Sequence, residues 1–339
     1  MIRNPFFSLE QFRHPLDVVS IENALIDLLV RANDSDLKTF GMAKGVMQLV
    51  DEETQKKVLK NLGNVKPEVE LGGSASNAIR GMAILGSKTS YSSCVGNDDY
   101  GKAFANRMAE LGILNRLSVI DNIHSGTCLV VVTPDGERTL NTYLGACRSY
   151  KSSFIPFDDI SKSKILFTTG YMLDTQNQID ALHAAIDYAL LHDVKVAFDA
   201  ADPFVIKRHG QKTMLSLLEK VHLVFLNAEE AKILIELEPE AAAMELSKTV
   251  QIAVVKDGEK GAYIAHDEKV IFIPAKKVEV ADTTGAGDMF AGGFMFGLCN
   301  GLTLQQSGQI ATLLASDTVS YMGVRLSSNI RTQVEAILS

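Results

Sequence analysis

The feature that most constrains the fold of this chain is an alternation of short apolar runs with helical patterns across its centre. The run at 164–169 is followed at 176–191 by apolar residues with helical spacing, and this order is repeated further along. Strands that alternate with helices form βαβ units, and such units build a mostly parallel sheet with helices on both faces. The sequence therefore predicts an α/β fold with three layers. Its expected strands are 164–169, 194–198, 222–226 and 251–255, and its expected helices are 176–191, about 205–218 and a segment from Ala228.

The pattern of the N-terminal half predicts short strands that do not alternate with helices in the same way. Residues 127–133 and 138–144 have strand patterns and flank Pro134-Asp-Gly-Glu137, a hairpin turn signal. We expect a small β element, assembled from discontinuous pieces and inserted into the α/β domain; the alternative is an edge extension of the main sheet. The other expected elements are a first core strand at 18–30, strands at 46–50, 68–71 and 89–95, helices at 74–85 and 100–111, a hairpin of 262–265 with 270–273, and helices from Gly285 onward.

Composition argues against several classes of function. The chain has 339 residues and a net charge of −8, which disfavours non-specific binding to nucleic acid or to an anionic membrane. Its four cysteines form no CxxC pair, so neither a structural zinc site nor a disulfide framework is expected, and a reducing compartment fits. The apolar stretch 289–299 is too short to span a bilayer, and the first residues, MIRNPFFSLEQFRHP, lack the apolar core of a secretory signal. We therefore expect a soluble cytoplasmic protein.

The segment Asp282-Thr-Thr-Gly-Ala-Gly-Asp288 carries the clearest chemical signal. Its small residues precede an apolar helical pattern, so they open a helix whose first backbone N–H groups have no intrahelical partner. With the helix dipole, these groups form a pocket for anionic oxygen, and Gly285 and Gly287 let the backbone approach a ligand closely. Beside this pocket, the carboxylate of Asp288 can accept a proton from a hydroxyl while the amides stabilise a transferred phosphoryl group. The alternative is a helix N-cap by Asp282 or Thr284, with glycines for tight packing.

This segment and the residues after it, MFAGGF, resemble the C-terminal signature of the ribokinase-like (PfkB) carbohydrate and nucleoside kinases. The resemblance implies a ribokinase-like three-layer α/β/α domain, with a central mostly parallel sheet and a small discontinuous β lid. It also implies that Asp288 is the catalytic base and that the amides of Gly285, Ala286 and Gly287 form the anion hole. A P-loop kinase is disfavoured because no GxxxxGKS/T motif is present. The resemblance covers 17–331, with lid pieces at about 36–50, 66–71 and 117–144.

Two upstream segments resemble the substrate-binding parts of the same family. In Leu71-Gly-Gly-Ser-Ala-Ser-Asn77, two glycines would open a helix so that a sugar can lie on bare backbone, and Asn77 offers a donor and an acceptor to hydroxyls. In Glu22-Asn23-Ala-Leu-Ile-Asp27, Asp27 matches an aspartate that binds sugar hydroxyls. Taken alone, the first segment could be a Gly-Gly helix cap with Ser74 as N-cap, and Asp27 a strand-end cap. The expected substrate-binding residues are Asn23, Asp27, Gly72, Gly73 and Asn77.

Two further segments resemble the nucleotide-binding parts of the family. Asn227-Ala-Glu-Glu230 fits an NxxE motif that helps to hold Mg²⁺ and its waters; the alternative is a capping box. Val255-Lys-Asp-Gly-Glu-Lys-Gly261 resembles the loop that covers the adenine and ribose of ATP, with Lys where many members carry Thr; a plain hairpin turn is the alternative. Relatives bind a monovalent cation such as K⁺ around the positions of Asp282 and Thr284. The resemblance implies ATP binding by Asn227, Lys256, Gly258 and Gly261, and Mg²⁺ binding by Asn227 and Glu230.

Several details resemble the adenosine kinase branch of the family. Gly72-Gly-Ser74 lacks the lysine that ribokinases tend to have after the glycine pair, Asp202-Pro-Phe204 resembles a Pro-Phe of that branch, and Arg138 matches an arginine that reaches the transferring phosphate. We therefore expect an ATP-dependent phosphotransferase acting on the primary hydroxyl of a ribosyl substrate, with adenosine converted to AMP. The candidates for purine stacking are Phe40, Tyr143, Tyr171 and Phe204, with core or lid packing as the alternative for each.

Two other functions stay open from the sequence. One is a kinase of a free sugar or sugar acid, such as ribose, fructose or 2-keto-3-deoxygluconate. The other is a catalytically silent nucleotide-binding relative, although the intact Asp288 disfavours it. The expected partners are ATP and a small sugar or nucleoside, with no nucleic acid and no membrane, and the protein is expected to be a monomer or a homodimer.

Overall fold

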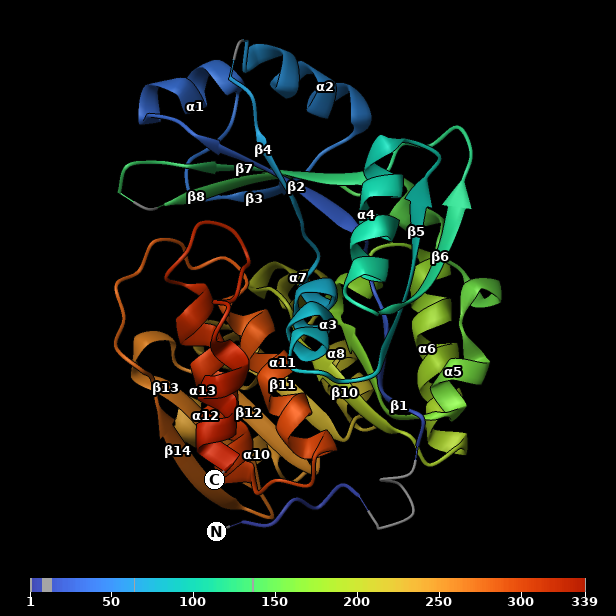
Figure 1. Cartoon of the computed structure of the whole chain (residues 1–339), viewed down its shortest axis with the longest axis vertical. Helices are drawn as coiled ribbons and strands as arrows, with labels where there is room; N and C mark the ends of the chain where they lie inside the picture. Colours follow the sequence, from blue (N-terminus) through green and yellow to red (C-terminus); the bar gives the residue numbers. More distant parts are fainter. Residues whose placement is uncertain (1, 8–13, 64, 136, 339) are drawn as a thin grey trace.

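The computed structural model describes residues 2–7, 14–63, 65–135 and 137–338; residues 8–13 of the N-terminal segment and Gly136 of the expected hairpin turn lie outside this description. Its main feature is a nine-stranded sheet (Figure 1) with the order β14-β13-β12-β11-β10-β9-β1-β5-β6. All pairs from β12 to β6 are parallel, and β13 and β14 add an antiparallel hairpin at one edge. The strands are β1 (Leu16–Ile21), β5 (Thr89–Gly96), β6 (Leu114–Ile120), β9 (Ser163–Thr169), β10 (Lys195–Asp199), β11 (Leu223–Asn227), β12 (Ile252–Lys256), β13 (Gly261–His266) and β14 (Lys269–Pro274).

Helices cover both faces of this sheet, because successive residues of its buried strands point to opposite sides. Val18 of β1 packs into one hydrophobic core and its neighbour Val19 into the other. The predicted three-layer α/β fold is therefore confirmed. The helices of the first core are α3 (Ser74–Ile84), α4 (Asp99–Glu110), α11 (Ala286–Cys299), α12 (Leu304–Thr318) and α13 (Ile330–Leu338), and those of the second are α5 (Phe157–Ser161), α6 (Gln176–Leu191), α7 (Pro203–His209), α8 (Gln211–Leu218), α9 (Ala228–Ile235) and α10 (Pro239–Leu246).

A second, five-stranded sheet lies over the carboxyl ends of the parallel strands, at the top of Figure 1. Its order is β3-β8-β7-β2-β4, and β7 and β8 form the antiparallel hairpin that the turn signal predicted. Two short helices cover its outer face, while Cys128 on its inner face lines a cavity above the large sheet. We call this sheet and its two helices the lid. Its elements are β2 (Leu25–Arg31), β3 (Met47–Leu49), β4 (Glu68–Leu71), β7 (Gly126–Val132), β8 (Arg138–Tyr143), α1 (Asp34–Phe40) and α2 (Glu52–Asn61).

The structure differs from the sequence-based expectation in three segments. The single core strand expected at 18–30 is two strands, β1 and β2, because the chain leaves the large sheet after Ile21 and enters the lid at Leu25. Both strands are apolar, so hydrophobicity alone does not mark the change of sheet. The start of the range 117–144 belongs to β6, which pairs with β5 in the large sheet. The helix expected at about 205–218 is divided into α7 and α8 at Gly210, whose φ is 81°.

The packing of α11 against its neighbours sets the position of its first turn. A Cβ on Gly292 would lie 2.5 Å from the carbonyl oxygen of Ala78 in α3, and one on Gly293 would lie 2.8 Å from the Cα of Ala311 in α12. Glycine at both positions therefore allows α11 to approach both helices at backbone distance. The N-terminal ends of α3 and α11 consequently meet beneath the lid (Figure 1).

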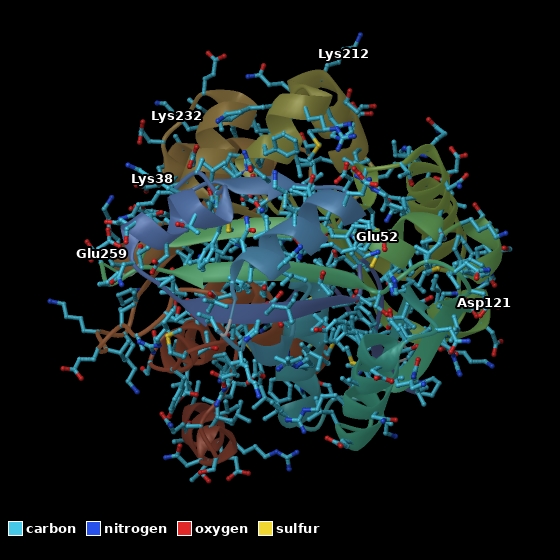
Figure 2. All side chains as sticks on the ribbon, turned by 90° about the horizontal axis from the view of Figure 1, so that it is seen from above. Lys38, Glu52, Asp121, Lys212, Lys232 and Glu259 are labelled. Carbon is cyan, nitrogen blue, oxygen red and sulfur yellow. The ribbon has the colours of Figure 1, made fainter. Side chains whose placement is uncertain are left out.

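The surface and the cysteines show ordinary features of a folded domain. The four cysteines are buried free thiols. Viewed from above (Figure 2), the lid strands cross the large domain, and charged side chains such as Lys38, Asp121, Lys212 and Lys232 project around the rim. Within the described ranges, every helix is too short or too polar to cross a membrane.

Candidate active site

Asp288 lies in the first turn of α11 and is held there by the first turn of α3. Its Oδ1 accepts a hydrogen bond from the hydroxyl of Ser74, and its Oδ2 accepts one from Nδ2 of Asn77 at 2.9 Å. The two donors are three residues apart, so they project from one face of α3. Burial raises the pKa of the Asp288 carboxyl, while the two hydrogen bonds act in the opposite direction. The result is a carboxylate that two hydrogen bonds fix in position in the wall of the cavity.

The backbone amides at the start of α11 are free to bind an anion. Its N-cap is Gly285, with φ of 70° and no side-chain hydrogen bond, and the amides of Gly287 and Asp288 have no acceptor among the described residues. The alternative interpretation, an N-cap by Asp282 or Thr284, is not what forms. Asp282 instead accepts hydrogen bonds from the amides of Thr284, at 2.9 Å, and Gly323, at 3.0 Å. An uncapped N-terminus with a glycine at its entry can hold anionic oxygen.

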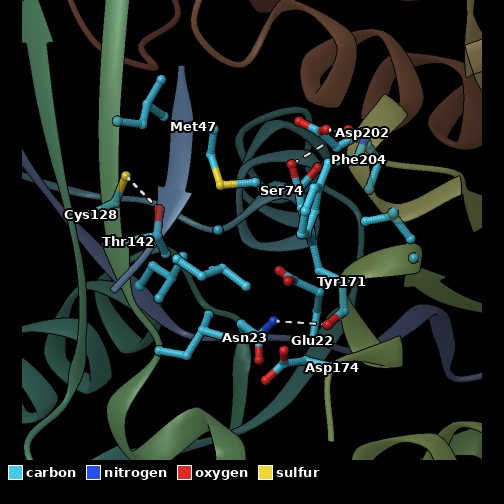
Figure 3. Close-up of a pocket in the computed structure, with 18 of the residues that line it drawn as sticks. Glu22, Asn23, Met47, Ser74, Cys128, Thr142, Tyr171, Asp174, Asp202 and Phe204 are labelled. Carbon is cyan, nitrogen blue, oxygen red and sulfur yellow. Dashed lines mark hydrogen bonds between the residues drawn. The ribbon is translucent and has the colours of Figure 1, made fainter. Parts of the chain in front are cut away.

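A cavity of about 330 Å³ separates the lid from this helix start (Figure 3). The cavity brings together residues that are far apart in the sequence, among them most of those expected to bind substrate. Gly72 does not line it, but a Cβ at that position would lie 2.1 Å from Oδ1 of Asp27, so the glycine makes room for this carboxylate. The expected residues that line the cavity are Asn23, Asp27, Gly73, Asn77, Arg138, Gly285 and Asp288.

Two further carboxyl groups are buried in the cavity wall. Burial raises the pKa of Asp27 to about 7, against the opposing charge of Arg80. Burial also raises the pKa of Glu22 to about 8, although its Oε2 accepts a hydrogen bond from the amide of Ala75 at 3.3 Å. The charge of Asp288 adds to both increases. Near neutral pH, these groups can therefore accept or donate hydrogen bonds to a ligand.

The two amide side chains of the cavity are already partly engaged. Asn77 donates to Asp288, and its Oδ1 accepts from Nη1 of Arg80 at 2.9 Å. Asn23 accepts from Nε2 of Gln178 at 2.8 Å. Of the donor and acceptor that Asn77 was expected to offer to substrate hydroxyls, only its second amide N–H is left unused by the described residues. Its hydrogen bond to Asp288 instead orients that carboxylate.

Arg138 connects the lid with the start of α11. It is the first residue of β8, and its Nη1 donates to Oγ1 of Thr284 at 2.6 Å. Its Nε also lies 4.0 Å from Oδ1 of Asp282. The guanidinium group of Arg138 is therefore held by Thr284, the residue that precedes Gly285.

The residues expected to bind nucleotide lie at the carboxyl edge of the large sheet, outside the cavity. Asn227 and Glu230 form the capping box of α9: Oδ1 of Asn227 accepts from the amide of Glu230 at 2.8 Å, and Oε2 of Glu230 accepts from that of Asn227 at 2.7 Å. Gly258 and Gly261 bracket the 3₁₀ turn between β12 and β13, with φ of 54° and 135°. Lys256 ends β12 and reaches α11, since its Nζ lies 3.1 Å from the position of a Cβ on Gly287.

The family model for pfkB family carbohydrate kinases matches residues 40–331 of this chain. The chain belongs to this family. The resemblance predicted from its motifs is therefore confirmed, and a kinase fold of this kind accounts for the large sheet and the lid.

Solved and curated members of the pfkB family include nucleoside and sugar kinases. The crystal structure of adenosine kinase from Sinorhizobium meliloti is 30% identical, with a TM-score of 0.88 over 95% of this chain and 99% of that chain. The structure of a probable sugar kinase from Rhizobium etli is 29% identical, with a TM-score of 0.89 over 95% and 98%. Adenosine kinase from Schizosaccharomyces pombe is 24% identical over 333 residues, which cover 90% of this chain and 95% of that protein. These relatives identify a kinase without fixing its acceptor.

Sequence analysis of this pfkB kinase missed four side chains around the motif residues. Ser74 is not the N-cap of α3, which is Gly73; the hydroxyl of Ser74 instead donates to Asp288. The spacing of Ser74 and Asn77 could have suggested this, because residues three apart share a helix face. No sequence signal pointed to the others, whose partners are distant along the chain; they are Glu22, Arg80 and Asp199.

Proposed function

We propose that this pfkB-family kinase transfers the terminal phosphoryl group of ATP to the primary hydroxyl of a ribosyl substrate, with adenosine as acceptor and AMP as product. The observation that carries the proposal is the position of Asp288. Its carboxylate is held by Ser74 and Asn77 beside free helix amides, and it shares a cavity with Asp27. A positioned base next to an anion pocket is what transfer from a phosphate donor to a hydroxyl requires.

In the proposed reaction, Asp288 accepts the proton of the acceptor hydroxyl. Burial supports this role because it raises the pKa of the carboxyl and makes its ionised form a stronger base. Asp27 and the backbone at Gly73 bind the sugar hydroxyls, and Arg138 supplies positive charge beside the anion pocket. The small sheet acts as a lid that excludes water, which would otherwise compete with the substrate as acceptor.

ATP and Mg²⁺ fit the groups at the carboxyl ends of the parallel strands. The amides of Gly287 and Asp288 suit phosphate oxygens, whereas that of Ala286 donates to the carbonyl oxygen of Thr283 at 3.4 Å. The turn at Gly258 and Gly261 would cover the nucleotide. Asn227 and Glu230 would hold Mg²⁺ through its water shell, and the ion would neutralise charge on the phosphates. Across the described part of the chain, no group of three or more His, Cys, Asp or Glu side chains could hold a metal ion. We therefore expect the ion to enter with the nucleotide, whose phosphates complete its coordination.

The cavity lining favours a nucleoside over a free sugar. A free sugar presents hydroxyl groups in every direction, whereas a nucleoside has a polar ribose and a largely apolar base. The cavity offers both kinds of contact, because its carboxyl and amide groups are accompanied by a set of apolar side chains. The similarity to an adenosine kinase structure at 30% identity is compatible with this acceptor, and the lining is what favours it over a free sugar. The apolar lining residues are Leu25, Met47, Leu49, Leu140, Leu144, Leu173, Phe204 and Val205.

The acceptor is tested by measuring ADP release with adenosine, other nucleosides, ribose, fructose and 2-keto-3-deoxygluconate. We expect the highest kcat/KM with adenosine. Met47→Gln keeps the length of the side chain but adds polar atoms to the apolar lining, so it should raise the KM for adenosine several-fold and leave that for ribose unchanged. A preference of the wild type for a free sugar would refute the adenosine assignment and leave the kinase assignment intact.

The role of Asp288 is tested with Asp288→Asn, which keeps the shape of the side chain but cannot accept the proton. We expect kcat to fall by about 10² to 10⁴-fold, with ATP affinity, measured by calorimetry, changed by less than about threefold. Asp99→Asn, an exposed residue in the first turn of α4, is the matched control. Near-normal turnover by Asp288→Asn would show that this carboxylate is not the base, and a wild type inactive with every acceptor would favour a silent relative.

A further inference from the structure

Lys256 occupies an unusual position beside the start of α11. It ends β12, and its side chain crosses Gly287, with Nζ 3.1 Å and Cε 3.8 Å from the position that a Cβ on this glycine would take. Any other residue at 287 would crowd the lysine. The side chain is 16% exposed and does not line the cavity that holds Asp27, so it approaches Gly287 from outside the acceptor site.

A buried ion pair holds this ammonium group in place. Nζ of Lys256 donates to Oδ2 of Asp199 at 2.9 Å, and Oδ1 of Asp199 accepts from the amide of Ala201 at 2.9 Å. Burial acts to lower the pKa of Lys256, but the carboxylates of Asp199 and Glu230 outweigh it and raise the pKa above its ordinary value. The lysine is therefore charged at neutral pH, and Asp199 fixes its position.

The charge of Lys256 has the wrong sign for the end of the helix that it meets. The N-terminus of a helix is its positive pole, and the amides of Gly287 and Asp288 have no acceptor within the described residues. A cation packed against this pole is repelled by the free amides, and in the ligand-free protein that repulsion is offset by the nearby carboxyl groups of Asp199, Glu230 and Asp288. An anion bound between Nζ and the amides would remove it altogether. A buried Lys–Asp pair also adds little to stability compared with apolar side chains of the same volume. Both arguments point to an anionic ligand as the reason for a lysine at this position.

We propose that Lys256 binds the terminal phosphate group of the phosphoryl donor, and that Asp199 is the residue that positions it. This inference rests on the proposed function and extends it, because the loop that contains Lys256 was expected only to cover adenine and ribose. An ammonium group and helix amides then hold the same phosphate oxygens from two sides. The acceptor approaches from the cavity, and Asp288 lies between the two.

The test compares binding of ATP and ADP, since only ATP has the terminal phosphate. Lys256→Met alone would leave the Asp199 carboxylate buried without its partner, so the double variant Asp199→Asn/Lys256→Met removes both charges together. We expect its ATP affinity, measured by calorimetry with Mg²⁺, to fall about 10- to 100-fold, as for loss of a charge-assisted hydrogen bond. Its ADP affinity should change by less than about threefold. Asp199→Asn alone leaves the charge of Lys256 in place but loosens its position, so the loss of ATP affinity should be intermediate.

The matched control is Asp187→Asn/Lys220→Met, which removes an exposed Lys–Asp pair on the surface and should leave both affinities unchanged. An equal loss of ATP and ADP affinity, or a lower melting temperature with unchanged ATP affinity, would overturn the proposal and make the pair purely structural. Failure of the proposed function is a separate result, because it would appear as a wild type that does not phosphorylate adenosine. The comparison of ATP with ADP would still decide the role of Lys256 in that case.

Discussion

The buried carboxyl of Glu22 should make this kinase less stable at alkaline pH. Its pKa rises from 4.5 to about 8 in the folded state, chiefly through burial. The folded protein therefore keeps a proton that the unfolded chain releases, so stability is lost as the pH rises from 4.5 through 8. The predicted penalty is about 1 kcal/mol at pH 5 and about 5 kcal/mol at pH 8.5.

Glu22→Gln removes this penalty, because the amide resembles the protonated acid in shape and does not ionise. Relative to the wild type, the variant should gain about 4 kcal/mol of unfolding free energy between pH 5 and pH 8.5. The measurement is urea-induced unfolding at both pH values, in the absence of ligands. Asp27 and Asp288 titrate in both proteins, so their own contributions largely cancel, and the difference reports Glu22 together with its charge coupling to Asp288. Glu53→Gln, an exposed residue of α2, is the control. Parallel pH profiles for Glu22→Gln and the wild type would refute the argument.

Three further predictions concern the packing around the cavity and the proposed Mg²⁺. Gly72→Ala places a Cβ 2.1 Å from Oδ1 of Asp27 and should displace this carboxylate. The KM for the acceptor should then rise by about tenfold or more, while ATP affinity measured by calorimetry stays unchanged. An unchanged KM would exclude Asp27 from the acceptor site. Arg80→Met leaves the carbonyl groups of Leu71 and Val324 and Oδ1 of Asn77 without their donor. The unfolding free energy, measured with urea, should fall by about 3 kcal/mol. No change would mean that water replaces these hydrogen bonds. EDTA should abolish turnover and leave the melting temperature of the ligand-free protein unchanged, since the described residues contain no metal cluster; a lower melting temperature would reveal a resident ion.

Most parallel strands of the large sheet could be predicted from the sequence because they are buried on both faces, whereas the largely exposed edge strand β6 was not predicted. Strands buried on both faces form continuous apolar runs, and the predicted run at 222–226 differs from β11 by one residue at each end. The lid was harder to delimit. Its strand β2 is as apolar as β1, and only three-dimensional pairing assigns it to the small sheet, next to β4 and β7.

The motif residues could be predicted because their small size and charge are visible locally, but their partners could not. Asp288 and the glycines before it carry a signal within seven residues. The contact of Asp288 with Ser74 spans 214 residues, and nothing in either segment specifies the other. The same applies to Asp199 and Lys256, which end two strands of the sheet that are separated by β11. Side-chain chemistry can be inferred from a short segment, whereas a pairing depends on the fold.

Close helix packing explains why these partners meet at one point. Gly292 and Gly293 let α11 approach α3 and α12 at backbone distance, which brings the first turn of α11 to the first turn of α3. Because α3 begins directly below the lid strand β4, the same contact places Asp288 in the wall of the acceptor cavity.

The opposite side of the first turn of α11 faces the ends of strands of the large sheet. Parallel strands end at one edge, so β10 and β12 bring Asp199 and Lys256 to Gly287 without any loop of their own. In the proposed reaction, the acceptor is therefore held by elements of the lid and α3, and the donor by the edge of the sheet. The first turn of α11 lies between the two groups, so it combines a carboxylate that faces the acceptor with bare backbone that faces the donor.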